Sequence, residues 1–248
     1  MELKESYIAG SFEGPEQTWE VTDELVQSVM TRVLRNDFTQ PGVALLDGGT
    51  TGEPRAFREF LWKLVQGMDA QFQKQHNKKL WMVSAVHMNQ KYSTQAHIDA
   101  GPAEGLLILG YEPTAVKSQI CVTDYIQYAQ SIGQPVPTFL REYPSKHQEH
   151  LKKMVPFTTE LLAFQPDRYQ VVIFNNSSLT LESCKRGMHG MLGVMHQASI
   201  DDQADEKHER IINSIMLGVA SLDALSLYGD DDLQKFIEGQ SYSYGYGN

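Results

Sequence analysis

Two histidines and one aspartate are the residues whose types and spacing could do chemistry. His97 and Asp99 lie two positions apart in the segment QAHIDAGP (95–102). In an extended segment, side chains two positions apart point to the same face, so an imidazole and a carboxylate could meet one cation. His196 ends the apolar stretch MLGVMH (191–196) and could supply a second imidazole. The alternative interpretation is an ordinary pair of surface side chains that follows a strand.

A second histidine competes with His196 for the same role. His189 lies close to Gly187 and Gly190, where a turn is expected. We favour His196 because it lies within an apolar strand and because Arg210 follows it by a distance that suits a hairpin return. The other histidines outside strands, at positions 76, 147, 150 and 208, have polar and charged neighbours and are expected at the surface.

Arg210 opens the apolar stretch RIINSIML (210–217). A buried guanidinium is costly unless an anion meets it, so Arg210 is expected to have an anionic partner. Two imidazoles and one carboxylate, with the other coordination positions open, are the ligand set of non-haem Fe(II) oxygenases. The open positions suit a bidentate co-substrate and dioxygen, and a guanidinium nearby could hold a distant carboxylate. Zinc is disfavoured because the sequence has no cysteine pair and no HExxH segment.

The order of His-x-Asp, a distant histidine and an arginine about one strand later resembles the 2-oxoglutarate-dependent non-haem iron oxygenases. These enzymes are built on a double-stranded β-helix, or jelly roll, and the resemblance covers about residues 80–220. It implies that His97, Asp99 and His196 bind Fe(II). It also implies that Arg210 pairs with the C5 carboxylate of 2-oxoglutarate, the co-substrate.

Three further residues are candidates for co-substrate contacts under this resemblance. Ser214 is expected on the same strand face as Arg210, four positions later. Asn89 and Tyr92 lie on the strand that leads to the His-x-Asp segment, where the family often places such contacts. The alternative is that all three are ordinary polar groups of strands.

The resemblance also implies a reaction. Relatives that halogenate carry a small residue in place of the metal-binding carboxylate, whereas this chain keeps Asp99. Hydroxylation or another C–H oxidation is therefore expected, with dioxygen consumed and succinate and CO2 released. The expected substrate is a small polar molecule, such as an amino acid or another metabolite.

Two other hypotheses remain open at this stage. The first is a cupin-like metal enzyme that uses the same metal site without 2-oxoglutarate. The second is a non-catalytic β-sandwich binding module in which the pattern of His and Asp is accidental. Arg210 separates the first hypothesis from the oxygenase, and metal binding separates the second.

The elements that must position these residues follow from periodicity and turn signals. Apolar residues at helical spacing predict a helix over 23–36 and another that begins at Pro54. The proline-containing stretch 125–158 is expected to be a partly helical insertion between strands. The segment NNSS (175–178) follows a strand and is interpreted as a turn or as a donor of hydrogen bonds to a polar substrate. Strands are expected at 42–46, 81–91, 105–111, 118–124, 159–164, 170–176, 191–199 and 210–218.

Helices followed by many short strands predict an α+β fold with a β-sandwich or barrel core and supporting N-terminal helices. The resemblance implies that this core is a double-stranded β-helix. We expect one domain, with a helical support region at 1–79, the core at 80–220 and a C-terminal helix and tail at 221–248. The chain has 248 residues and a net charge of −10, which makes nucleic acid an unexpected partner. The sequence shows no secretory signal and no membrane span, so a cytoplasmic location without a membrane partner is expected.

Overall fold

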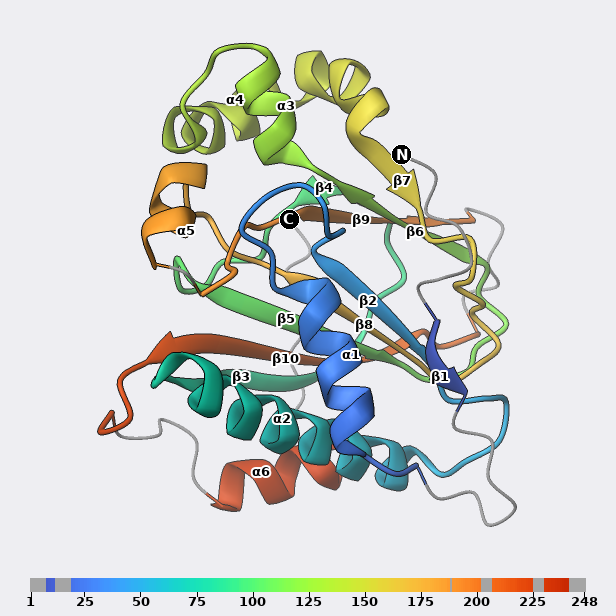
Figure 1. The fold of residues 1–248 in the computed structure, drawn as a ribbon. Coiled ribbons are helices and arrows are strands. Elements are labelled where there is room, and N and C mark those ends of the chain that lie inside the picture. Colours follow the sequence, from blue (N-terminus) through green and yellow to red (C-terminus); the bar gives the residue numbers. More distant parts are fainter. Residues whose placement is uncertain (1–7, 12–18, 188, 202–206, 225–229, 241–248) are drawn as a thin grey trace.

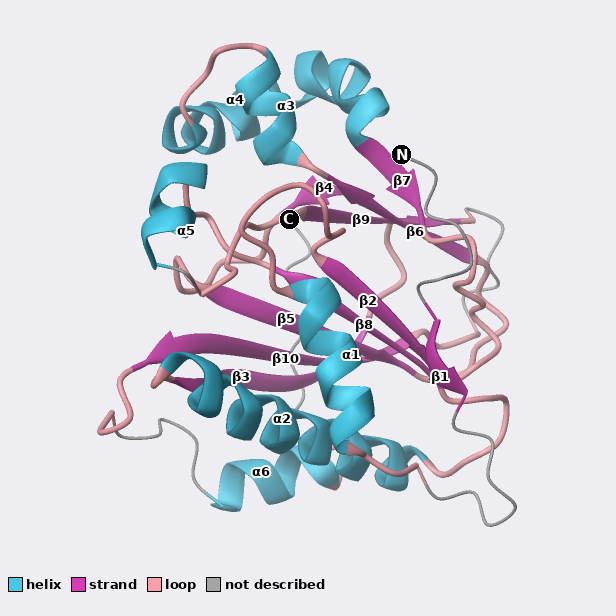
Figure 2. Ribbon diagram, viewed as in Figure 1, coloured by secondary structure: helices cyan, strands magenta, loops and turns pink. Residues whose placement is uncertain are grey.

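The structure is a computed structural model that describes residues 8–11, 19–187, 189–201, 207–224 and 230–240. Two β-sheets lie one over the other, with helices on their outer sides (Figures 1 and 2). The predicted α+β class is therefore confirmed. None of the described helices is long and apolar enough to cross a lipid bilayer. Residues 241–248, the end of the predicted C-terminal tail, lie outside the described residues.

The larger sheet has six strands in the order β1-β2-β8-β5-β10-β3. Neighbouring strands are antiparallel, except that β1 and β2 are parallel. In sheet order, the strands are β1 (Ile8–Ser11), β2 (Val43–Asp47), β8 (Gln170–Asn175), β5 (Gly105–Tyr111), β10 (Ile211–Ala220) and β3 (Lys79–Asn89).

The smaller sheet has four antiparallel strands in the order β4-β9-β6-β7. These strands are β4 (Thr94–His97), β9 (Met195–Ile200), β6 (Ser118–Thr123) and β7 (Thr158–Glu160). Apolar side chains from both sheets fill the space between them, and we call this set the inter-sheet core. It contains Val43, Leu45, Leu107, Leu109, Tyr111, Ile120, Val122, Leu161, Phe164, Val172, Phe174, Val194, Ala198, Ile212 and Met216.

Strand alternation explains why the central strands are continuously apolar in sequence. In β5, Leu107 and Leu109 point into the inter-sheet core, whereas Leu106 and Ile108 point to the helices on the outer face. A strand that is covered on both faces has no polar positions to alternate with apolar ones. The two outer layers therefore determine the sequence of these strands as much as the core between the sheets does.

Three helices cover the outer face of the larger sheet (Figure 1). They are α1 (Asp23–Val33), α2 (Pro54–His76) and α6 (Asp230–Ile237). The hydroxyl of Thr22 accepts a hydrogen bond from the Leu25 amide and caps α1, and Pro54 occupies the first turn of α2. Both predicted helices are confirmed, although α1 ends at Val33 rather than at residue 36.

The predicted insertion at 125–158 is almost entirely helical. It forms α3 (Tyr125–Ser131), α4 (Val136–Met154) and a short 3-10 turn (Val155–Phe157), which pack behind the smaller sheet. A further helix, α5 (Leu181–Gly187), joins the same layer. His150 in α4 is buried and makes a 2.8 Å hydrogen bond between its Nδ1 and the Tyr128 hydroxyl. The expected surface position of His150 is therefore wrong, because α3 covers that face of α4.

Two strands are shorter in the structure than the sequence predicts. The predicted strand 191–199 starts only at Met195. The residues before it make isolated backbone hydrogen bonds instead of a ladder: the Leu192 amide donates to the Arg35 carbonyl, and the Val194 amide donates to the Asn175 carbonyl. The predicted strand 159–164 ends at Glu160, and the chain then turns. Residues 191–194 are still buried, and so are Leu161 and Phe164, whereas Leu162 is exposed. The apolar composition of these positions therefore reflects burial more than strand pairing.

Candidate metal centre

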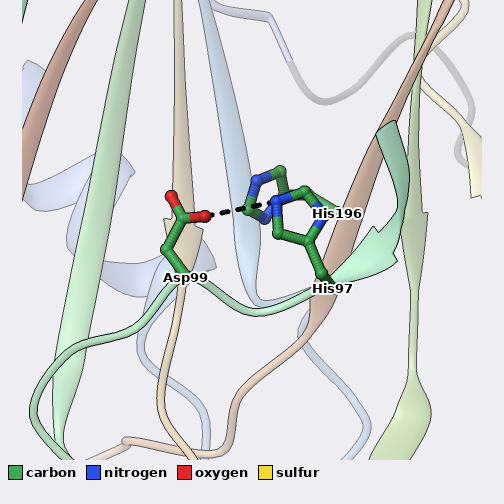
Figure 3. A group of neighbouring side chains, drawn as sticks. All are labelled: His97, Asp99 and His196. Carbon is green, nitrogen blue, oxygen red and sulfur yellow. Dashed lines mark ion pairs between the residues drawn. The ribbon is translucent and has the colours of Figure 1, made fainter. Parts of the chain in front are cut away.

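His97, Asp99 and His196 converge although 99 positions separate the two histidines (Figure 3). His97 is the last residue of β4 and lies directly opposite His196 of β9 in the antiparallel register. The preceding residues, Ala96 and Met195, point to the helical layer, so alternation turns both imidazoles toward the larger sheet. One ligand atom from each of the three residues lies within 4.8 Å of the others. The structure thus brings the predicted metal ligands together.

The tautomer of His97 follows from its hydrogen bond. Its Nδ1 lies 2.6 Å from the carbonyl oxygen of Gln95, which can only accept, so Nδ1 carries the proton in the neutral ring. This leaves a lone pair on Nε2, which lies 3.2 Å from Oδ1 of Asp99. Burial lowers the pKa of His97, but the bonds to Asp99 and Gln95 outweigh it, and the pKa is raised overall. In the protonated ring, Nε2 donates its proton toward Asp99, and a metal ion would take the place of that proton.

His196 is the buried member of the group, with 7% of its surface exposed. Its ring stacks on Phe174 of the inter-sheet core at a centroid distance of 4.8 Å. Burial, together with the nearby charge of His97, lowers the pKa of His196 to about 3. His196 is therefore neutral at ordinary pH, which is the form that binds metals. Its Nδ1 is buried and has no hydrogen-bond partner among the described residues.

Asp99 lies just beyond β4, in the connection to β5. Burial raises the pKa of its carboxyl, but the hydrogen bond from His97 and the charges of both imidazoles lower it overall. The side chains of His97 and Asp99 are each 37% exposed, so one side of the group is open. Two neutral imidazole donors and an ionised carboxylate fit a divalent transition metal, and the group could hold such an ion.

Arg210 lies immediately before β10 and is only 1% exposed. Its Nε lies 3.3 Å from the Ser118 hydroxyl and its Nη1 lies 3.2 Å from Oε1 of Gln90. The guanidinium carbon lies 5.1 Å from the centre of the Tyr111 ring. Nη2 is buried without a hydrogen-bond partner, and no carboxylate within the described part of the chain pairs with this cation.

Tyr111 lies beside Arg210, and its phenol is influenced by the charges of both Arg210 and Asp99. Burial raises the pKa of the Tyr111 phenol, the Arg210 cation opposes this shift, and the Asp99 carboxylate adds to it. The phenol is thus within electrostatic reach of both. We call His97, Asp99, His196, Tyr111 and Arg210 the inter-sheet site.

The structure places the other candidate residues in different surroundings. Ser214 is buried on the same face of β10 as Arg210, as the strand alternation predicts. Asn89 accepts a hydrogen bond from the backbone amide of Arg210, so it holds the start of β10 rather than facing a ligand. Tyr92 is 77% exposed, and the structure does not bring it to Arg210. His189 pairs with Glu104 at 2.9 Å, so His196 rather than His189 joins the pair at 97 and 99.

Sequence reasoning missed four residues around the inter-sheet site. Tyr111, Ser118 and Gln90 surround Arg210, and Asn176 binds the backbone of Asp99. In the segment 175–178, Asn175 ends β8 and the next three residues follow it without a turn, so the turn interpretation is wrong. The side chains of Asn175, Asn176 and Ser177 are buried and donate hydrogen bonds to backbone carbonyls of the protein, which does not favour a substrate contact. Tyr111 had a weak signal, since it lies two positions after Leu109 in a strand that is buried on both faces.

Comparisons with known proteins assign no family: no family model matches the sequence, and no curated protein matches it. The function therefore has to be inferred from the side chains of the inter-sheet site and from the strands that carry them.

Proposed function

We propose that the protein is an Fe(II)- and 2-oxoglutarate-dependent dioxygenase that hydroxylates, or otherwise oxidises, a C–H bond of a small polar substrate. The observation that carries this proposal is Arg210, a buried cation whose Nη2 has no partner. A guanidinium in such a place calls for an anion, and it faces the same inter-sheet space as a group of metal-ligand type. A dicarboxylate that reaches from a metal to an arginine satisfies both.

The strand order supports a double-stranded β-helix. Taken from β3 to β10, eight strands form two antiparallel sets, β3-β10-β5-β8 in the larger sheet and β4-β9-β6-β7 in the smaller one. A jelly roll likewise consists of eight strands in two sheets. The chain adds β1 and β2 next to β8 at one edge of the larger sheet.

Each residue of the inter-sheet site has a role under this proposal. His97, Asp99 and His196 would hold the iron from one side and leave its other positions open. Arg210 would pair with the C5 carboxylate of 2-oxoglutarate, and the Tyr111 hydroxyl would donate a hydrogen bond to the same group. When bound, iron and 2-oxoglutarate supply the oxidising chemistry, which consumes dioxygen and releases succinate and CO2.

Two features of the chain favour the reaction and substrate class that we propose. The carboxylate of Asp99 occupies the position that a halide would need, which favours hydroxylation over halogenation. The net charge of −10 disfavours a nucleic acid as the substrate. A small polar molecule fits both features.

Ligand-induced stabilisation under anaerobic conditions tests the proposal. Protein loaded with Fe(II) should gain about 2.7 kcal/mol of unfolding free energy from 2-oxoglutarate at about 100 times its Kd. Arg210→Met should bind Fe(II) like the unmodified protein and lose the gain from 2-oxoglutarate. Arg55→Met, which changes an exposed arginine, is the matched control and should keep it. With dioxygen and a substrate present, the unmodified protein should form succinate.

The two rival hypotheses correspond to two other results. A cupin-like enzyme would bind the metal but show no response to 2-oxoglutarate that depends on Arg210. A non-catalytic module would bind neither ligand, and His196→Ala would then change no metal affinity.

A further inference from the structure

The backbone of Asp99 is held by a single buried side chain. Oδ1 of Asn176 accepts a hydrogen bond of 2.9 Å from the Asp99 amide, and Nδ2 of Asn176 donates one of 3.0 Å to the Asp99 carbonyl. Asn176 is 1% exposed and directly follows β8. One carboxamide therefore satisfies both backbone polar groups of the residue that offers its carboxylate to the metal.

Asp99 needs such support because it lies outside the regular strands. It falls in the connection between β4 and β5, two residues after the ladder ends at His97. Further bonds tie the same connection to the segment after β8: the Ser178 amide donates to the Ala103 carbonyl, and the Asn176 amide donates to the Gly105 carbonyl. Within this set, the side chain of Asn176 alone contacts Asp99.

Asparagine is chemically suited to this position. Its side chain presents a donor and an acceptor in one plane, as a backbone peptide group does, so it can pair with an amide and a carbonyl together. Alanine offers neither, and serine is too short to meet both. In metal sites, the groups that orient the ligands typically contribute a factor of about 10–100 in metal affinity.

We propose that Asn176 is a positioning residue of the metal centre, which fixes the direction of the Asp99 carboxylate and thereby sets the affinity for a divalent metal. This inference rests on the proposed function only in that His97, Asp99 and His196 must bind a metal. Asn176 itself touches neither metal nor substrate, and it acts through the backbone of Asp99.

Calorimetric titration of the full chain with Ni(II) tests the inference. Asn176→Ala should weaken Ni(II) binding about 10–100-fold relative to the unmodified protein. Asn176→Ser, a milder change that leaves a hydroxyl in the buried space, should also weaken it. Ser177→Ala is the matched control, because Ser177 is the next buried residue and its hydroxyl bonds Gly105 instead of Asp99. It should leave the Kd for Ni(II) within about twofold.

The same Asn176 substitution made in an Asp99→Ala variant separates an effect on metal affinity from an effect on the stability of the fold. Asp99→Ala removes the carboxylate but keeps the amide and carbonyl that Asn176 binds, so Asn176→Ala should lower the unfolding free energy equally in both backgrounds. Its effect on Ni(II) affinity should disappear when residue 99 has no carboxylate. An unchanged Kd in Asn176→Ala, or an equal loss in Ser177→Ala, would overturn this inference alone. No Ni(II) binding by the unmodified protein would overturn the metal centre and this inference with it.

Discussion

Arg35 and Arg210 are both buried arginines, yet their surroundings differ in one respect. Arg35 is 4% exposed, and its Nη1 forms a 2.8 Å ion pair with Asp124. Its remaining donors meet backbone carbonyls at Gln40, Leu192 and Gly193. Arg210 is buried at least as deeply, but it has neutral partners and one unpartnered nitrogen. The protein surrounds one guanidinium with partners and leaves one nitrogen of the other without a partner among the described residues.

The position of each arginine agrees with this difference. Arg35 follows α1 and holds the irregular segment that precedes β9, where an isolated β-bridge between Arg35 and Met191 takes the place of a regular strand pairing. Arg210 lies at the start of β10 on the face toward the inter-sheet core. Arg58, on the outer face, follows the first pattern, since its Nη1 pairs with Glu112 at 3.0 Å. Arg35 and Arg58, the other two buried arginines of the described residues, thus each have a carboxylate partner.

The largest expected effect is the difference in unfolding free energy between the variants that remove the two guanidinium groups. Arg35→Met should lower the unfolding free energy by about 3–5 kcal/mol, because it leaves a carboxylate and three carbonyls without their donor. Arg210→Met should cost less than about 1 kcal/mol in the ligand-free protein, because it removes a buried charge that has no counter-ion. Urea denaturation of both variants measures this. Equal losses would mean that Arg210 is as much a structural residue as Arg35.

A smaller effect concerns protons at the inter-sheet site. The pKa of His196 is lowered to about 3, so this ring carries no proton to release at mildly acid pH. The pKa of His97 is raised above its usual 6.5, so below that pKa a metal must displace one proton. Affinity for Ni(II) should therefore fall about tenfold for each pH unit between about pH 6 and pH 4.5. A hundredfold fall in affinity for each pH unit would show that both imidazoles are protonated, which would contradict the lowered pKa of His196.

The smallest expected effect is that of the Tyr111 hydroxyl. Tyr111→Phe keeps the ring beside Arg210 and removes one donor to the bound carboxylate. It should weaken 2-oxoglutarate binding by about 1 kcal/mol, or roughly fivefold, with no change in metal affinity. Tyr169→Phe, which loses a hydrogen bond to Gly52 away from the inter-sheet site, is the control and should leave this affinity unchanged. If Arg210 alone recognises the anion, Tyr111→Phe will behave like the unmodified protein.

Local pattern was enough to single out His97, Asp99 and Arg210, but it did not single out the residues that contact them. His97 and Asp99 are neighbours in sequence, and Arg210 opens an apolar strand, so each stood out from the residues around it. Tyr111 and Asn176 reach the site because β5 and β8 pair with each other and with their neighbours. Such long-range pairing leaves no local periodicity in the sequence, and both residues therefore resembled ordinary strand and turn positions.

The helical content of the insertion at 125–158 was underestimated for a different reason. Its prolines suggested irregular chain, but three of them occupy places that a helix tolerates and Pro144 accompanies a kink. Pro135 precedes α4, Pro137 lies in its first turn, and Pro144 lies two residues before a break at Lys146, where φ is −120° and ψ is 15°. Pro156 falls in the 3-10 turn that follows. The number of prolines is therefore a poor guide to the helical content of this segment, because the position of each proline decides whether a helix can form.

The cross-strand register of His97 and His196 has a consequence for engineering. Because β4 and β9 set the spacing of the two rings, the length of chain between them is free to vary without altering that spacing. Peptide inserted at an exposed turn of the intervening stretch, such as the Ile132–Gly133 turn after α3, should leave the geometry of both rings intact. The same chain could then carry an additional recognition module while the spacing of His97 and His196 stays unaltered.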